Sequence, residues 1–265
     1  MSFNVRLFDV YKWSKNAEAK AEIFKLIQSY NPDILCLQEI YYERKPGYIT
    51  LKELKQKTGL NHLHVENSSE LHGNFCFGIA TLSRFPILSK SVIEFGNHTD
   101  NLAIYTDIKF ADVTVRVFNM HLESIRFRNE DYETMKNLTG VEDKVNLDGE
   151  RKIAGRMKRA YKERARQAVL VRNTIQKTHH SVLVAGDFND TPGSYAYHQV
   201  KGDLSDAFVA KGKNSGSTYV SKLPFMRIDY IMYDKSFDCT GFERVNKVLS
   251  DHYPIVADFK HQAKD

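Results

Sequence analysis

Residues 182–192 read Val-Leu-Val-Ala-Gly-Asp-Phe-Asn-Asp-Thr-Pro, an apolar run that gives way at once to polar side chains. The first four residues are of types that favour a buried strand. If the strand geometry persists, Asp187 and Asn189 leave on one face, because side chains two positions apart in a strand point the same way. A carboxylate beside an amide could hold a water and a phosphoryl oxygen. The alternative is an Asp and Asn turn that only closes a strand.

Similar apolar runs recur along the whole chain and predict further strands. They lie at residues 3–8, 34–37, 75–82, 113–119, 228–233 and 255–259. Apolar residues follow helical spacing at 17–29 and, over a longer stretch, at 153–175. A chain of 265 residues with 42% hydrophobic content can bury one large core. We therefore expect a strand-rich α and β protein and a single domain over residues 1–265.

Composition argues against membrane-spanning and disulfide-stapled proteins. No apolar run approaches the roughly 18 residues that a membrane span requires, so the chain as given is predicted to be soluble. Cys36, Cys76 and Cys239 lack paired spacing, which favours buried thiols and a reducing, cytoplasmic setting. Asn4 already lies in a predicted core strand, so the sequence is compatible with an upstream targeting or anchoring segment. The net charge of +5 suits an anionic substrate.

Two more strands end in polar side chains that suit phosphoryl chemistry. Glu39 follows Leu35-Cys36-Leu37-Gln38, and hard cations such as Mg²⁺ are commonly held by carboxylates together with water and substrate oxygens. His121 follows Val117-Phe118-Asn119-Met120, where an imidazole can hydrogen-bond a phosphoryl oxygen or a leaving group. Taken alone, each residue is more often solvated or structural.

A carboxylate and a histidine near the C-terminus extend the same pattern. Asp229 lies within the predicted strand at 228–233, and His252 follows Ser250-Asp251 just before the last strand. Asp229 could accept a hydrogen bond from one ring nitrogen of His252 and so fix its tautomer and raise its basicity. Five polar clusters drawn from the whole chain, each suited to metal-assisted phosphoryl chemistry, indicate one site.

These motifs together resemble those of the endonuclease/exonuclease/phosphatase superfamily over nearly the whole chain. The matching segments are, in order, Asn4, Leu37-Gln38-Glu39, Asn119-Met120-His121-Leu122, Gly186-Asp187-Phe188-Asn189, Arg227-Ile228-Asp229-Tyr230 and Ser250-Asp251-His252-Tyr253-Pro254. The resemblance implies an α+β fold, a four-layer α/β/β/α sandwich of two mixed β-sheets flanked by helices. It also implies a hydrolase of phosphoester bonds with its site at one end of the sandwich.

The resemblance further assigns roles to the metal and water ligands. It places a divalent cation, Mg²⁺ or Mn²⁺, on Glu39, with Asn4 and Asp251 close to that cation. It assigns Asp187 to orienting or deprotonating the attacking water and Asn189 to holding the phosphoryl group. The implied reaction is in-line attack of water on phosphorus, with the metal and hydrogen-bond donors neutralising the transition state.

Two histidines complete the implied machinery. His252, oriented by Asp229, would stabilise the charge that develops on the phosphoryl oxygens. His121 would assist from the other side, matching members that carry His where abasic-site nucleases carry Tyr.

Departures from the family pattern narrow the expected activity. Many members have a second Asn or Asp two residues after the first Asn, whereas this chain has Arg6, which argues against a second metal there and predicts a phosphate contact. Gln38-Glu39-Ile40 lacks the Thr-Lys that follows the same Glu in abasic-site nucleases. His121-Leu122-Glu123-Ser124, followed by Arg126, looks like tyrosyl-DNA phosphodiesterases and some lipid-directed relatives. Arg6 and Arg126 are therefore the predicted substrate-binding residues.

Charge distribution separates the candidate functions only weakly. The helix predicted at 153–175 is rich in Arg and Lys; a solvated outer face is the plainer interpretation, and a phosphate-binding patch is the alternative. The polar stretch 123–149 is the best candidate for a mobile insertion. We expect a phosphoester substrate, with nucleic acid as a candidate, and rank a nuclease-like phosphodiesterase ahead of a small-molecule or lipid phosphoesterase of sphingomyelinase or inositol-phosphatase type. A non-catalytic binding protein ranks third.

Overall fold

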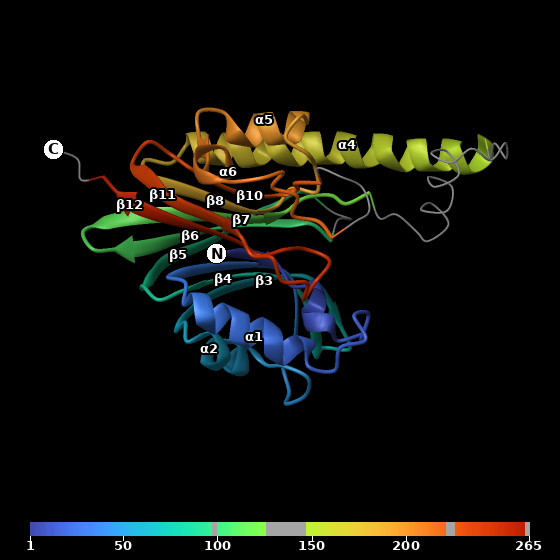
Figure 1. Cartoon of the computed structure of the whole chain (residues 1–265), viewed down its shortest axis with the longest axis horizontal. Helices are drawn as coiled ribbons and strands as arrows, with labels where there is room; N and C mark the ends of the chain where they lie inside the picture. The colour runs from blue at the N-terminus through green and yellow to red at the C-terminus, as the bar shows by residue number, and fades with distance from the viewer. Residues whose placement is uncertain (97–99, 126–146, 221–225, 263–265) are drawn as a thin grey trace.

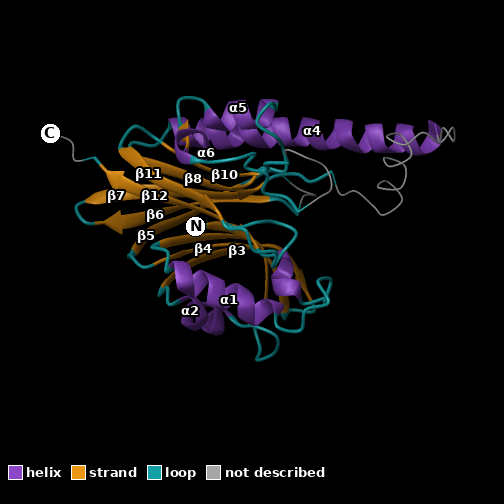
Figure 2. Cartoon of the chain, viewed as in Figure 1, coloured by secondary structure: helices purple, strands orange, loops and turns teal. Residues whose placement is uncertain are grey.

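Two β-sheets pack face to face, and helices cover their outer faces (Figures 1 and 2). The computed structural model describes residues 1–96, 100–125, 147–220 and 226–262. The helices are α1 (Ala19–Tyr30), α2 (Leu51–Thr58), α4 (Leu147–Gln176), α5 (Tyr195–Lys201) and α6 (Ala207–Lys211), with a short 3-10 turn at Arg6–Asp9. The α+β four-layer sandwich predicted from the sequence is confirmed.

The first sheet has the strand order β11-β12-β1-β2-β4-β3. Its strands are β1 (Ser2–Asn4), β2 (Ile34–Glu43), β3 (His62–Leu71), β4 (Phe75–Ser83), β11 (Phe237–Arg244) and β12 (Ile255–His261). β1 pairs in parallel with β2, and the other pairings are antiparallel. The sheet is therefore mixed, and it brings the first strand of the chain beside the last.

The second sheet has the strand order β5-β6-β7-β8-β10-β9. Its strands are β5 (Ile87–Ile93), β6 (Leu102–Phe110), β7 (Val113–His121), β8 (Ser181–Asp187), β9 (Ser205–Asp206) and β10 (Asp229–Tyr233). β7 and β8 run parallel, in register from Val115↔Ser181 to His121↔Asp187. The crossover between them contains α4, as a parallel connection requires.

Alternating side chains of the central strands divide the apolar core into layers. On β2, Leu35 and Leu37 pack with the α1 side of the first sheet, whereas Cys36 packs between the sheets. On β8, Val182 and Val184 pack with α4 and α5, whereas Ala185 faces the other sheet. Strands buried on both faces read as continuous apolar runs, which is why these two were recognisable in the sequence.

Several elements differ from the sequence-based prediction. The strand predicted at 3–8 ends at Asn4, because residues Arg6–Asp9 form a turn with positive φ at all four positions. The strands β3, β5, β6, β9 and β11 were not predicted. β3, β5, β9 and β11 lie at sheet edges, where polar and apolar residues mix, whereas β6 is an interior strand that the sequence analysis missed. The insertion proposed at 123–149 falls mostly outside the described residues.

The cysteines agree with the expectation of buried thiols. All three cysteines are buried and free. Among the described residues, the structure contains no helix with the length and apolarity needed to cross a membrane.

Candidate active site

The ends of parallel strands bring the predicted site residues to one edge of the sandwich. Asn4 ends β1 and pairs in parallel with Gln38 of β2, while His121 ends β7 and pairs in parallel with Asp187 of β8. Both parallel pairs therefore finish at the same edge, one pair in each sheet. The first residue of β10, Asp229, pairs with Asp187 and joins them there.

A β-bulge directs Glu39 into this edge. Between the pairs Leu37↔Ala80 and Ile40↔Gly78, two residues of β2 stand opposite one residue of β4. Glu39 takes a positive φ of 47° at the bulge, which turns its side chain out of the normal alternation. Gly78 is required opposite the bulge, because a Cβ there would lie 1.9 Å from the backbone oxygen of Glu66.

Asn4 joins the two sheets at the site. Its Nδ2 donates to Glu39 Oε1 and to Asp187 Oδ2, each at 3.0 Å, and its Oδ1 accepts from the backbone N–H of Arg6 at 3.1 Å. The side chain is fully buried. Asn4 was predicted to stand near a metal, and in the structure it fixes the orientation of the two carboxylates.

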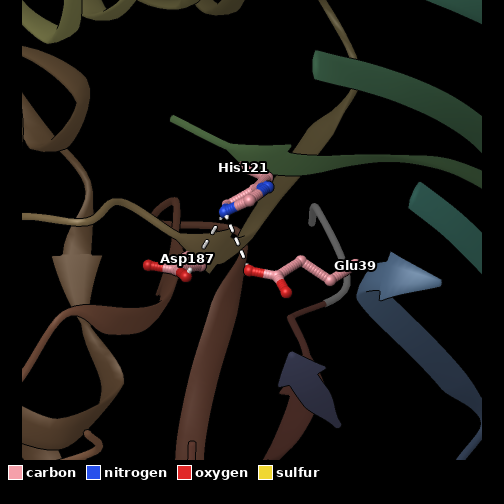
Figure 3. Close-up of side chains that lie close together, drawn as sticks. All are labelled: Glu39, His121 and Asp187. Carbon is pink, nitrogen blue, oxygen red and sulfur yellow. Dashed lines mark ion pairs between the residues drawn. The ribbon is translucent and has the colours of Figure 1, made fainter. Parts of the chain in front are cut away.

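His121 lies between the carboxylates of Glu39 and Asp187 (Figure 3). Its Nε2 is 3.5 Å from Glu39 Oε1 and 3.7 Å from Asp187 Oδ2. One ligand atom from each of these three side chains lies within 4.8 Å of the other two, which is close enough for the three to hold one metal ion.

Asp187 is the centre of the group. It is almost fully buried, and its Oδ1 accepts a hydrogen bond from the backbone N–H of Asn189 at 2.8 Å. Burial raises the pKa of Asp187, which makes this carboxylate a better proton acceptor. The preceding Gly186 has a φ of +143°, and a Cβ there would lie 2.1 Å from the backbone oxygen of Met120.

Asn189 leaves the strand in a left-handed conformation with φ 53°. Its Nδ2 donates to the backbone oxygen of Leu122 at 3.0 Å, which ties the segment after β8 to the segment after β7. The extended geometry expected over Asp187 and Asn189 therefore breaks after Asp187, and the amide nitrogen is held by a backbone carbonyl.

His252 lies beside the same Asp187 oxygen as His121. Its Nδ1 is 2.9 Å from Asp229 Oδ2, and its Nε2 is 3.6 Å from Asp187 Oδ2. Burial lowers the pKa of His252, but the charges of Asp229 and Asp187 and the hydrogen bond to Asp229 outweigh it, so this pKa lies well above its ordinary value. The predicted pairing of Asp229 with His252 is present, and it favours the protonated form of His252.

Two other predicted residues pair with each other. Arg6 Nε is 3.3 Å from Asp251 Oδ2, and the Arg6 guanidinium lies 4.6 Å from the centre of the Trp13 ring. In the described part of the chain, Asp251 does not belong to either group of acidic and histidine side chains that come within ion-binding distance of one another. Arg126 lies outside the described residues.

Comparisons with known proteins identify the family. The sequence model of the Endonuclease/Exonuclease/phosphatase family matches residues 1–252. The chain belongs to this family. A comparison with curated proteins gives no match.

Solved structures of other proteins share the fold of this family member. A mannosyl-6-phosphatase of Bacteroides thetaiotaomicron VPI-5482 superposes with a TM-score of 0.71 at 15% identity, covering 98% of each chain. The catalytic domain of human Nocturnin, with bound sulfate, gives 0.67 at 20% identity, covering 98% of this chain and 92% of that chain. A D. rerio TDP2 humanized by 14 mutations gives 0.67 at 18% identity, covering 98% and 97%.

Family membership makes the chain a hydrolase of phosphoester bonds, in a family whose enzymes depend on divalent metals. The donor set tests whether a metal suits this chain. Glu39 and Asp187 supply carboxylate oxygens, which hard cations prefer, and His121 supplies an imidazole, which Mn²⁺ accepts more readily than Mg²⁺. These residues fit a divalent cation.

The sequence analysis missed residues that hold the site together. Gln38 Nε2 donates to Asn119 Oδ1 at 2.7 Å between the two sheets. On α4, buried Arg164 donates to Asp190 Oδ2 at 2.9 Å and to the backbone oxygen of Glu123 at 2.7 Å. Gln38 and Asn119 lay within the matched motifs, so their buried positions could have been inferred. Arg164 gave no local signal, because it was one of many basic residues on a helix.

Proposed function

We propose that this hydrolase is a divalent-metal-dependent, nuclease-like phosphodiesterase in which an activated water attacks phosphorus in line. The observation that carries the choice of substrate is a basic stripe on α4, defined as Arg151, Lys152, Lys158, Arg159, Lys162 and Arg166. All six side chains are exposed, and at 3.6 residues per turn they fall within about a third of the helix circumference. A polyanion suits such a stripe better than a small phosphomonoester does.

The position of α4 relates this stripe to the site. α4 leads into β8, which begins at the far end of the sandwich and finishes at Asp187, so the N-terminal half of the helix points toward the site edge. With 30 residues, α4 is about 45 Å long, against about 23 Å for the seven residues of β8. The helix therefore extends past the strands (Figure 1).

The residues of the site divide the chemistry between them. Glu39 and Asp187 would hold the cation, which when bound neutralises charge on the phosphoryl oxygens. Asp187 orients the attacking water and accepts its proton. Asn189 helps to hold the phosphoryl group.

The two histidines, both beside Asp187 Oδ2, act on the reacting phosphoryl group. The His252 imidazolium, held through Nδ1 by Asp229, donates from Nε2 to a phosphoryl oxygen. His121 offers Nε2 to the same group. Because these donors are already in place, little reorganisation accompanies the build-up of charge in the transition state.

A cavity beside the site favours a second candidate, a small-molecule or lipid phosphoesterase. It has a volume of about 280 Å³. Its lining includes the polar residues Glu39, Ser68, Ser69, Asp100 and His121 and the apolar residues Leu7, Phe77 and Ile79. A cavity of this size suits a compact leaving group, and its serine and acidic side chains could hydrogen-bond hydroxyl groups. The structural similarity to a mannosyl-6-phosphatase is consistent with this alternative.

A substrate screen decides between the two candidates. The purified protein, with Mg²⁺ or Mn²⁺, is incubated with DNA, phosphotyrosyl-DNA, sphingomyelin, inositol phosphates and mannose 6-phosphate. The proposal expects DNA or phosphotyrosyl-DNA to be cleaved and the His252→Gln variant to lack that cleavage. Hydrolysis confined to the other substrates would establish the second candidate, and no hydrolysis by any arm would favour a binding protein.

Salt dependence tests the basic stripe separately. Affinity of the His252→Gln variant for DNA is measured between low and physiological salt. Adding Lys158→Ala and Lys162→Ala should reduce the slope of log K against log salt by about 2, because each lost phosphate contact removes about 0.9. The control pair Lys109→Ala and Lys260→Ala, exposed at the far end of the sandwich, should leave the slope unchanged.

A further inference from the structure

Two aromatic side chains are exposed on the segment that follows β1, at the site edge. Tyr11 is 58% exposed and Trp13 is 44% exposed, and their ring centres are 5.1 Å apart with planes tilted by 55°. Exposed large aromatics cost hydration free energy, and together such rings commonly mark a binding surface. Neither ring has a role in the chemistry proposed above.

The backbone beneath these rings is strained. Arg6, Leu7, Phe8 and Asp9 all have φ between 42° and 57°, the left-handed region. This conformation costs about 1 to 2 kcal/mol for each residue with a Cβ. Strain of this kind persists only where the surroundings enforce it, and it is concentrated at functional sites.

Buried contacts hold the strained turn in one conformation. Phe8 is fully buried and stacks on Phe24 at 5.4 Å, and its backbone oxygen accepts from the Tyr48 hydroxyl at 2.7 Å. Asp9 accepts hydrogen bonds from the backbone N–H and the hydroxyl of Ser14. The rings are therefore presented by an ordered segment, and little conformational entropy is lost when a ligand stacks on them.

Arg6 connects these rings to the site. Its guanidinium lies over the Trp13 ring and pairs with Asp251, while its backbone N–H donates to the Asn4 side chain that holds Glu39 and Asp187. The Trp13 ring is thus linked to the site carboxylates through Arg6 and Asn4. A cation beside an aromatic ring is the combination that single-stranded nucleic acids bind, through phosphate and base respectively.

We propose that Tyr11 and Trp13 form a stacking platform for a nucleobase of a single-stranded substrate whose neighbouring phosphate contacts Arg6. This proposal rests on the nuclease-like function and names its substrate class. Lys12 and Lys15, interspersed with the rings, add positive charge for flanking phosphates. An anionic lipid surface would also attract these two lysines, so vesicles are the competing partner in the titration below.

The sequence provides its own probe, because Trp13 is the only tryptophan in the chain. Fluorescence of the His252→Gln variant, which binds without turnover, is titrated with a short oligothymidylate. Parallel titrations use the same oligomer with abasic sugars, inorganic phosphate, and vesicles of phosphatidylserine and phosphatidylcholine. We expect quenching by oligothymidylate and little change with the abasic oligomer or phosphate.

Three outcomes would overturn the platform: no quenching by oligothymidylate, equal quenching by the abasic oligomer, or a response to vesicles alone. Binding is measured without hydrolysis, so these outcomes are distinct from failure of the substrate screen. If the screen finds no nuclease activity while base-dependent quenching persists, the nuclease proposal fails and the base-binding site stands.

Kinetics supply a second test wherever single-stranded DNA is cleaved. Trp13→Leu should raise KM for that substrate by about 5- to 100-fold with little change in kcat, because stacking binds substrate and transition state alike. The matched control is Phe110→Leu, a 38% exposed ring at the opposite end of β6 from the site edge, which should leave KM unchanged. Equal KM values for the Trp13 and Phe110 variants would contradict the platform even if DNA is cleaved.

Discussion

At the scale of single residues, the site contains a buried histidine that lies between two carboxylates. His252 sits 2.9 Å from Asp229 and 3.6 Å from Asp187, and these charges hold its pKa well above the ordinary value despite burial. We predict that His252→Gln lowers kcat by about 100- to 10,000-fold, because glutamine can hydrogen-bond Asp229 but carries no positive charge. Steady-state hydrolysis of the substrate found in the screen measures the effect.

Loss of fold must be separated from loss of chemistry in this variant. His179→Gln, in the exposed segment before β8 at the far end of the sandwich, is the matched control and should retain full kcat. Circular dichroism should show the same folded spectrum for both variants. A His252→Gln protein that is folded and fully active would remove His252 from the mechanism.

A second buried histidine, far from the chemistry, makes stability depend on pH. His64 on β3 is 1% exposed, and its Nδ1 lies 2.8 Å from the Thr106 hydroxyl. Burial, followed by the positive charge of Lys90, lowers its pKa to about 4. Below the unfolded pKa of about 6.5, the unfolded chain binds a proton that the folded protein does not. Stability contributed by neutral His64 is therefore lost as pH falls from about 6.5 toward 4.

Chemical denaturation at a series of pH values tests this assignment. Between pH 6 and 4.5, the wild-type free energy of unfolding should fall more steeply than that of His64→Gln, by up to about 1.4 kcal/mol per pH unit. The difference between the two proteins isolates His64 from the other titrating groups. If the free energy of unfolding depended on pH equally in the two proteins, the pKa of His64 would not be lowered by folding.

At the scale of elements, irregularities in the first sheet orient the carboxylate of Glu39, the proposed metal ligand. β2 has its bulge at Glu39, and β3 has a second irregularity between Asn67 and Ser69, so both neighbours of β4 depart from regular pairing beside Gly78. We predict that Gly78→Ala lowers the free energy of unfolding by about 1 to 3 kcal/mol, because its Cβ would overlap the Glu66 carbonyl. Urea denaturation measures this, and Mn²⁺ calorimetry should show weaker binding.

Gly155 on α4 provides the matched control for this substitution. A Cβ there would meet nothing within 4 Å, so Gly155→Ala should raise the free energy of unfolding by about 0.5 to 1 kcal/mol through helix propensity alone. Mn²⁺ affinity should not change. If Mn²⁺ binding were weaker in both variants, the loss of affinity could not be attributed to the bulge at Glu39.

At the scale of the whole molecule, the core is complete without the metal. The three apolar clusters lie between the layers, while the candidate metal ligands Glu39 and His121 stand at the sandwich edge. We predict that a chelator abolishes hydrolysis while the protein stays folded. Adding Mn²⁺ at 100 times its Kd should raise the free energy of unfolding by about 2.7 kcal/mol, because the ion binds only the folded chain.

Glu39→Ala tests the assignment of this ligand within the same experiment. The variant should be folded but should gain little stability from Mn²⁺. Asp238→Ala, which removes an exposed carboxylate at the far end of the first sheet, should keep the full gain. If Mn²⁺ stabilised the Glu39→Ala variant as much as the wild type, the assignment of Glu39 as a metal ligand would be wrong.

The sequence by itself determined which strands end in candidate catalytic residues, because a buried strand and the polar residue after it are local features. Val182–Ala185 followed by Asp187, and the apolar run before Glu39, were recognisable for this reason. The family motifs then gave the sandwich fold, which is confirmed. The prediction that one domain covers residues 1–265 stays a prediction.

Only the tertiary structure decided how these residues meet. Asn4 and Asp187 are 183 positions apart, and their hydrogen bond exists because two sheets pack face to face. The bulge at Glu39 depends on pairing with β4, and the left-handed turn at Arg6–Asp9 depends on burial of Phe8. No local pattern encodes such contacts, since their free energy arises from groups that become neighbours only after the sheets have formed. For this reason residues 182–192 predicted a strand that ends in an acidic residue, whereas the side chains that contact Asp187 were identified only from the folded structure.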